Sequence, residues 1–102
     1  MDHEFRDGRL LLHRTPEQKA PLLKRLRRIE GQVRGLQQMI EEDRYCLDEV
    51  QQVNAATAAM REVALLIIQD HLEAAVEFAV SANDGAVAVK EMVGVLRAAM
   101  RQ

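Results

Sequence analysis

Cys46 and His71 are the two side chains of this sequence best suited to chemistry. Cys46 is the only cysteine, and His71 is the only histidine beyond the first 13 residues. A thiolate and an imidazole suit Cu(I), Zn(II), Ni(II) or Co(II), and two such ligands are few for any of these ions except Cu(I). The pair therefore points to a metal site, or to a reactive thiol with a histidine as its neighbour.

Both residues lie on one predicted helix, at opposite ends of an apolar seam. The seam rises by alternating steps of four and three residues, the spacing of a heptad repeat. At 1.5 Å rise per residue, Cys46 and His71 are roughly 37 Å apart but within about 20° of the same helix face. An antiparallel second copy would bring Cys46 of one chain beside His71 of the other, and twofold symmetry would make two such sites. Between its two ends the seam contains Val50, Val53, Thr57, Met60, Ala64 and Ile67.

The periodicity predicts three helices, at about residues 17–42, 44–80 and 85–101. Thr15 is a suitable cap for the first helix, and Pro16 suits its first position. Asp43 is predicted to cap the second helix, and the Ser-Ala-Asn-Asp-Gly run at 81–85 is predicted to be a turn. The fold class expected is therefore all-α, with one very long helix in the protomer.

Residues 1–14 show no apolar periodicity, so we expect a flexible N-terminal arm and no β-strand anywhere in the chain. The helical domain is then expected to span residues 15–102. His13 lies in the arm, and a histidine there would be placed to fold over and complete a site formed by other residues.

Charge is distributed unevenly along the chain. The 102 residues carry a net charge of −2, but residues 14–34 hold seven basic and two acidic residues, a net +5. Residues 35–102 hold five basic and eleven acidic residues, a net −6. This asymmetry predicts an anionic partner for the first helix, such as the phosphates of DNA. Its basic residues are Lys24, Arg25, Arg27, Arg28 and Arg34.

Several classes of protein are disfavoured by what the sequence lacks. It contains no phosphate-binding loop, no GxSxG and no HExxH motif, so we do not expect an enzyme. No apolar run is long enough for a membrane span, and no signal peptide is recognisable. With a single cysteine as well, the expected location is the cytoplasm. Aromatic residues make up only 3% of this small chain, which favours oligomerisation.

Four stretches together resemble the CsoR/RcnR/FrmR family of bacterial repressors. They are Leu23–Gly35, Met39–Cys46, Gln52–Ala55 and His71–Leu72. The resemblance covers about residues 16–100. It implies a three-helix protomer, antiparallel dimers and a disc-like homotetramer. It also implies an apo form that binds operator DNA and releases it when an inducer binds between protomers.

The resemblance also assigns roles to residues. Cys46 and His71 match the family's helical cysteine and histidine, whereas Tyr45 and Glu91 match a hydrogen-bonded pair that supports the ligands in the copper-sensing branch. That branch has a second cysteine four residues after the histidine, and this chain has Ala75 there. The five basic residues named above fall on the family's DNA-facing helix.

The inducer is left open between two kinds of signal. A metal ion is favoured, Cu(I) first and Ni(II), Co(II) or Zn(II) as alternatives, with His13 as a further ligand in a nickel- or cobalt-type site. The alternative is formaldehyde or another electrophile that reacts at Cys46 and needs no metal. A reading from a different class is a helical protein-interaction module whose basic helix binds an acidic protein.

Overall fold

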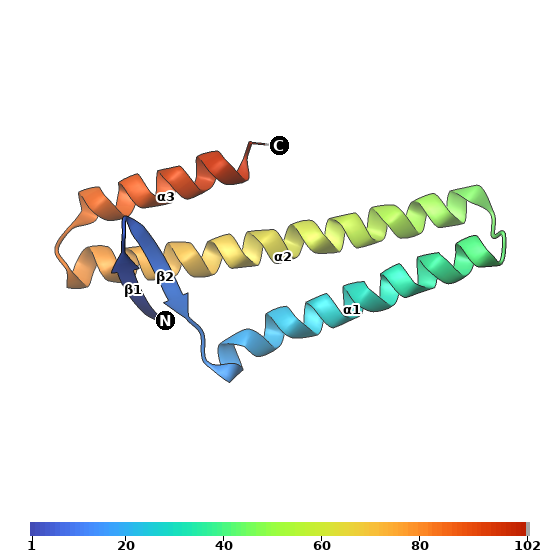
Figure 1. Ribbon diagram of the computed structural model, residues 1–102, viewed down its shortest axis with the longest axis horizontal. Helices are drawn as coiled ribbons and strands as arrows, with labels where there is room; N and C mark the ends of the chain where they lie inside the picture. The colour runs from blue at the N-terminus through green and yellow to red at the C-terminus, as the bar shows by residue number, and fades with distance from the viewer. Residues whose placement is uncertain (102) are drawn as a thin grey trace. The chain divides into compact units, whose positions relative to one another are not determined.

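The structure, a computed structural model, describes residues 1–101 and is mostly helical (Figure 1). Its elements are β1 (Asp2–Arg6), β2 (Arg9–His13), α1 (Pro16–Glu41), α2 (Cys46–Ser81) and α3 (Gly85–Ala99). The prediction of three helices is confirmed, and α2 is long, with 36 residues. Within residues 1–101, none of the helices combines the length and the apolarity that crossing a membrane requires.

The chain forms two compact units, and α2 contributes to both. One unit contains residues 16–66, and the other contains residues 1–15 together with the chain from residue 67 onward. In the first unit, α1 buries Ile29 and α2 buries Val63. The Gln52 side chain donates its amide N–H to the Gln32 carbonyl at 3.0 Å. A Cβ atom on Gly35 would lie 3.4 Å from the Gln52 amide nitrogen, so the Gln52 side chain lies directly against α1 at this glycine.

α1 and α2 end in the same way. Asp43 and Asn83 each adopt a left-handed backbone, with φ of 53° and 51°. The next residue returns a hydrogen bond to the last helical turn, from Arg44 N to Met39 O at 2.9 Å and from Asp84 N to Ala79 O at 3.1 Å. These are Schellman caps, so the prediction that Asp43 caps the start of α2 is wrong. Asp84 does cap α3, accepting from the Val87 N–H at 3.2 Å.

The N-terminal residues form a β-hairpin, so the prediction of a flexible arm without strands is wrong. β1 and β2 pair antiparallel, with Phe5 opposite Leu10. The turn consists of Asp7 and Gly8, both with positive φ, as a two-residue type I′ hairpin requires. The Asp-Gly pair between strands that alternate polar and apolar residues was the signal for this hairpin. The many charged residues around this turn concealed the alternation of polar and apolar side chains along the two strands.

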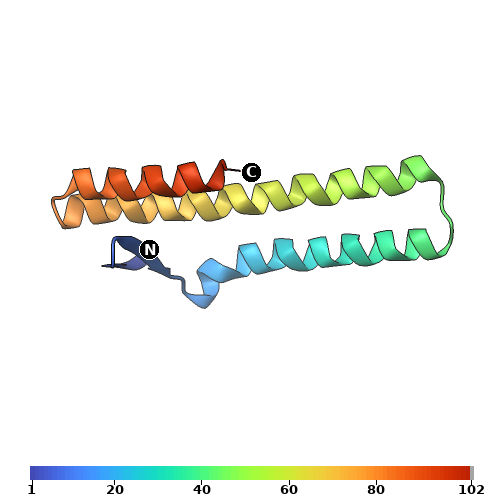
Figure 2. The ribbon, with the colours of Figure 1, turned by 45° about the horizontal axis from the view of Figure 1, so that its top comes forward.

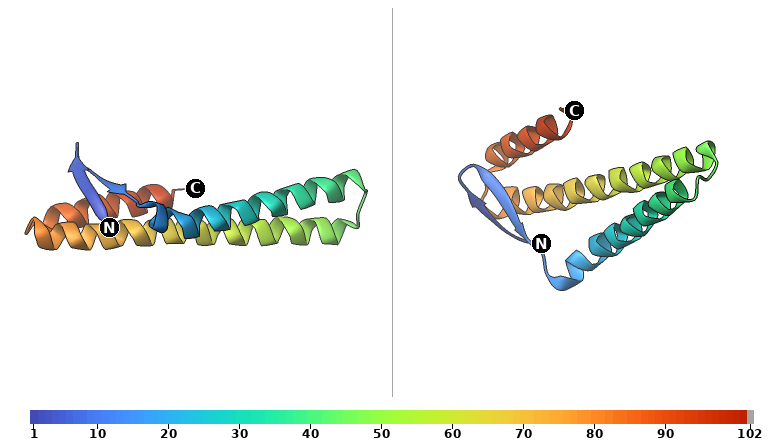
Figure 3. Two further views of the ribbon diagram at one scale, coloured as in Figure 1. Left: turned by 90° about the horizontal axis from the view of Figure 1, so that it is seen from below. Right: turned by 45° about the vertical axis from the view of Figure 1, so that its right-hand side comes forward.

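The hairpin lies across one face of the layer formed by α3 and the C-terminal part of α2 (Figures 2 and 3). Leu10 is buried there in one cluster with Ala74, Ala75 and Met92. The Phe5 ring stacks on Phe78, with ring centroids 4.9 Å apart. The two small alanines of α2 leave space for the hairpin to approach the helix closely, so residues 1–15 belong to the packed unit.

Candidate functional site

His71 is held by a carboxylate from α3. Its Nε2 atom lies 2.8 Å from Glu91 Oε1, and both side chains are largely buried, with 16% and 8% of their surface exposed. An ionised carboxylate can only accept, so Nε2 carries the hydrogen of this bond. A neutral His71 then has its free lone pair on Nδ1. The geometry therefore presents Nδ1 as the nitrogen that can bind a metal ion.

Glu91 also receives a hydrogen bond from the hairpin. Its second oxygen, Oε2, accepts from the Leu10 backbone N–H at 3.0 Å. One carboxylate thus links β2 of the hairpin to the histidine of α2. The resemblance pointed to Glu91, but it offered no indication of Leu10, because a backbone N–H has no signature in a sequence.

Cys46 is the first residue of α2, and it is a free, exposed thiol. Tyr45 precedes it and is 71% exposed. Both side chains are therefore accessible to a second chain or to a small molecule. The pairing of Tyr45 with Glu91 stays a prediction, and within this chain the Glu91 oxygens bind His71 and Leu10.

The position four residues after His71 is part of the hydrophobic core. Ala75 is only 4% exposed and packs with Leu10, Ala74 and Met92. A methyl group cannot bind a metal ion, so α2 offers His71 as its ligand at this end. Among residues 1–101, no three His, Cys, Asp or Glu side chains are arranged so that they could hold a metal ion.

His13 is engaged within the hairpin. Its Nε2 atom lies 2.9 Å from Glu4 Oε1, and both side chains are about half exposed. The structure therefore pairs His13 with Glu4 rather than with His71. A role for His13 as a metal ligand remains a prediction, and the contact with Glu4 involves only its Nε2 atom.

The apolar seam between Cys46 and His71 is open to solvent. Val50, Val53, Met60 and Ile67 are between 44% and 50% exposed. A row of large apolar side chains at heptad spacing is costly in water and is typical of a helix that packs against another helix. The seam is therefore a candidate interface that carries one soft ligand at each end.

A second exposed apolar surface lies on α3 and on the end of α2. α2 and α3 also border a shallow cavity of about 210 Å³ lined by Leu72, Ala75 and Met92 among others. The side chains of this surface extend well beyond that cavity. They are Leu72, Val76, Val80, Val89, Val93, Leu96 and Met100.

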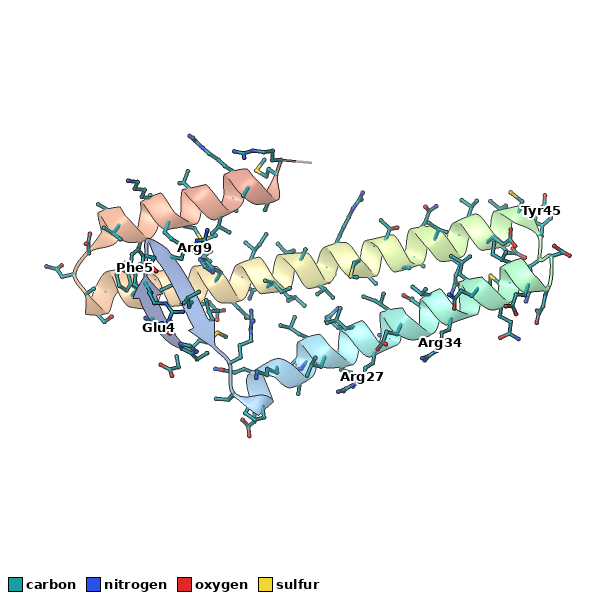
Figure 4. All side chains as sticks on the ribbon, viewed as in Figure 1. Glu4, Phe5, Arg9, Arg27, Arg34 and Tyr45 are labelled. Carbon is teal, nitrogen blue, oxygen red and sulfur yellow. The ribbon has the colours of Figure 1, made fainter. Side chains whose placement is uncertain are left out.

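The basic residues of α1 form an exposed face. Lys24, Arg25, Arg27, Arg28 and Arg34 are all exposed. Figure 4 shows Arg27 and Arg34 leaving α1 on the side turned away from α2. The two arginines are seven residues apart, so they lie on the same side of the helix roughly 10 Å apart along its axis. This spacing allows two guanidinium groups to contact successive phosphates of a nucleic acid backbone.

Comparison with known proteins places these features in a family context. The family model described as "Metal-sensitive transcriptional repressor" matches residues 18–98. The copper-sensing transcriptional repressor CsoR of Bacillus subtilis (strain 168) is 43% identical over 91 residues, which cover 89% of this chain and 90% of that protein. The copper-sensing transcriptional repressor RicR of Mycobacterium tuberculosis is 51% identical over 69 residues, or 68% of this chain and 72% of that protein.

Two solved structures resemble the fold. One is the copper-sensing repressor CsoR with Cu(I) from Geobacillus thermodenitrificans NG80-2, with a TM-score of 0.73, 38% identity, and coverage of 85% of this chain and 91% of that chain. The other is the nickel-responsive transcriptional regulator InrS, with a TM-score of 0.74, 31% identity, and coverage of 84% and 97%. The family model begins at residue 18, so the hairpin lies outside the residues it matches.

The Glu91 bridge should contribute measurably to stability. Replacing Glu91 with Ala removes the acceptor of two hydrogen bonds and leaves the N–H of buried Leu10 without its partner. We expect the free energy of unfolding to fall by about 1–3 kcal/mol, measured by urea denaturation at fixed protein concentration. Replacing the exposed Glu73 of α2 with Ala is the control, and it should change stability by about 0.5 kcal/mol or less. Equal losses in the two variants would show that the bridge is not stabilising.

Proposed function

This chain belongs to the family of metal-sensitive transcriptional repressors, and we propose that it represses by binding operator DNA as a homo-oligomer until an inducer binds at Cys46 and His71. The observation that carries this proposal is the exposed apolar seam of α2 with one soft ligand at each end. The seam needs a second helix for burial, and an antiparallel copy of α2 would complete two Cys46–His71 sites by symmetry.

The proposed dimer has a defined register. When Cys46 lies opposite His71 of the second chain, Val50 lies opposite Ile67 and Thr57 lies opposite Met60, so apolar side chains meet along most of the seam. The exposed apolar surface of α3 supplies a second interface. Two interfaces on one chain are what a closed dimer of dimers requires, and this supports the homotetramer that the resemblance implies.

We propose Cu(I) as the inducer. Two of the relatives and one of the similar structures are named as copper-sensing, and the donor set fits this choice. The Cys46 thiolate and the His71 Nδ1 atom are two soft or borderline ligands, and Cu(I) is the ion best served by so few. Nickel, named for InrS, is the alternative. It favours more nitrogen ligands, and here the position four residues after His71 is Ala75, which cannot bind.

The proposed mechanism couples the seam to the basic face of α1. An inducer held by Cys46 of one chain and His71 of the other would tie both ends of the paired helices together. It can shift the DNA-binding equilibrium only by binding one arrangement of the protomers more tightly than another. The arrangement that it favours would then be one in which the basic faces of α1 no longer match the spacing of the phosphates on the operator.

One observation favours a second candidate function, a repressor that responds to formaldehyde or another electrophile. Cys46 is an exposed thiol, and Ala75 leaves the metal site one ligand short of the copper-sensing pattern. Fold, oligomer and DNA contacts would be the same in this case. Only the chemistry at the Cys46 sulfur would differ, with a covalent bond to carbon in place of a bond to a metal ion.

Native and denaturing mass spectrometry of the reduced protein separate the two candidates. With Cu(I) we expect one ion per protomer under native conditions, lost on denaturation, and no covalent adduct after exposure to formaldehyde. In the Cys46→Ala variant the Cu(I) signal should disappear. A stable adduct on Cys46, together with no retained Cu(I), would reject the metal proposal and support the electrophile.

Cys46→Ala should separate induction from DNA binding. We expect operator affinity within about twofold of the original protein, because Cys46 lies outside the basic face, and we expect Cu(I) no longer to release the DNA. Fluorescence anisotropy with a labelled operator fragment measures both. Thr57→Ala, in the middle of the seam, is the matched control and should remain inducible. If Cys46→Ala abolishes DNA binding, the sensor assignment is wrong.

Arg27→Ala should weaken operator binding and lower its dependence on salt. Loss of one phosphate contact lowers the magnitude of the slope of log K against log[salt] by about 0.9. The slope falls by this amount for each protomer whose Arg27 contacts the DNA. Arg61→Ala, an exposed arginine of α2, is the control and should leave the slope unchanged. An operator titration that Arg27→Ala does not alter would place α1 outside the DNA interface.

A further inference from the structure

The β-hairpin forms a hydrogen bond with Glu91, the side chain that holds His71. Leu10 N–H donates to Glu91 Oε2 at 3.0 Å, and His71 Nε2 lies 2.8 Å from Glu91 Oε1. All three groups lie in a poorly solvated place, since the Glu91 side chain is 8% exposed and Leu10 is 5% exposed. A carboxylate in such surroundings is held by its hydrogen-bond donors rather than by water. The hairpin supplies one of its two donors.

The hairpin also contacts α2 on either side of His71. Arg14, just after β2, places its Nε atom 3.2 Å from Asp70 Oδ2. Leu10 packs against Ala74, and Phe5 stacks on Phe78. Asp70, Ala74 and Phe78 follow one another at intervals of four residues, so the contacts run along one side of α2 directly beside His71. The hairpin is therefore attached to the neighbours of the inducer histidine as well as to its carboxylate.

The hairpin nevertheless remains only partly packed. An open cavity of about 720 Å³ is lined by hairpin residues including Phe5, Arg9 and Leu10, by residues of α3, and by His71 and Glu91. Segments with incomplete packing open at a lower free-energy cost than the rest of a fold. An element that reports on a binding site needs this property, because its docked and undocked forms must differ by only a small free energy.

We propose that the hairpin is a positioning element of the inducer site, whose docking holds Glu91 in place and so presents Nδ1 of His71. Docked, it fixes the carboxylate between two donors and restricts the imidazole to the form with hydrogen on Nε2. Undocked, it exposes Glu91 to water, and the ring becomes free to rotate and to exchange between its two neutral tautomers. The link to an inducer rests on the function proposed above, whereas the link between hairpin and histidine concerns the free protein.

The coupling is reciprocal by thermodynamic necessity. If docking of the hairpin raises the affinity of His71 for an inducer by some factor, the inducer raises the docking equilibrium by the same factor. Partners that hold the second nitrogen of a metal-binding histidine typically change metal affinity about 10- to 100-fold. The hairpin contacts Glu91, which in turn holds His71, so it acts on the histidine indirectly. We therefore expect a smaller change in metal affinity, about three- to tenfold.

Two variants weaken docking without altering His71 or Glu91. Phe5→Ala removes the stack on Phe78. Gly8→Ala strains the turn, because Gly8 has φ of 75°, yet the added Cβ meets nothing within 4 Å, so this variant leaves the core unaltered if Phe5→Ala should fail to fold. Arg6→Ala, on the outward face of β1, is the matched control. Far-UV circular dichroism checks that the helices are retained.

The measurements use the full chain without metal. Hydrogen exchange of the Leu10 amide reports docking, and ¹⁵N chemical shifts of the His71 ring report which nitrogen carries hydrogen. In the original protein and in Arg6→Ala, we expect a protected Leu10 amide and hydrogen on Nε2. In Phe5→Ala and Gly8→Ala, we expect Leu10 protection to fall at least fivefold and the His71 shifts to move toward the average of the two tautomers.

Two results would overturn the proposal: Leu10 protection that neither variant lowers, or His71 shifts that stay constant in a variant whose Leu10 amide has lost its protection. A separate titration of the original protein and of Gly8→Ala with Cu(I) tests reciprocity: the factor lost in affinity should not exceed the factor by which Cu(I) raises Leu10 protection, and the two should be equal where the variant's hairpin is fully undocked. If Cu(I) leaves the His71 shifts unchanged, copper sensing fails, while the measurements on the free protein still decide the role of the hairpin.

Discussion

The surface of α2 exceeds what the rest of the chain can cover. A helix of 36 residues in a chain of 102 leaves about two thirds of the sequence to bury its apolar side chains. The structure leaves Val50, Val53, Met60 and Ile67 about half exposed along a single seam. Because burial of apolar surface is the main force that stabilises a fold, such a helix favours association with another copy. The proposed inducer site follows from this constraint, since its two ligands lie at the ends of the uncovered seam.

Around His71 the decisive group is the Glu91 carboxylate, which accepts one hydrogen bond from His71 and one from Leu10. It determines which imidazole nitrogen remains free, and it joins α2, α3 and the hairpin at one carboxylate. Loss of any one of the three partners would leave a buried polar group without a hydrogen bond, which costs more than the bond itself contributes. In the proposed coupling, the same geometry makes the proposed inducer site sensitive to a segment that lies outside the residues matched by the family model.

Ala75 shapes the chemistry proposed for the site. It belongs to the buried cluster with Leu10 and Met92, so the position at which the resemblance implies a second cysteine is here part of the packing under the hairpin. Two ligands from two chains remain, a thiol and an imidazole. A small donor set of this kind suits Cu(I) and leaves the thiol open to electrophiles, which is why the two candidate inducers can be separated by the fate of the Cys46 sulfur.

The sequence by itself determined the helices, the seam and the basic face. Each of these depends on a repeat along a single helix, and the periodicity of side chains expresses such a repeat directly. Residue type and charge made Cys46, His71 and the five basic residues of α1 the candidates for a site, and the family resemblance added Glu91. The Asp-Gly turn of the hairpin was also readable, although the charged residues around it concealed the strands.

Only the tertiary structure decided what these residues touch. It paired Glu91 with His71 and Leu10, paired His13 with Glu4, buried Ala75, and made Asp43 the end of α1 rather than the start of α2. These contacts join residues up to 81 positions apart or depend on a backbone N–H. Neither kind of information has a period along the chain, so it emerges only when the elements pack in three dimensions.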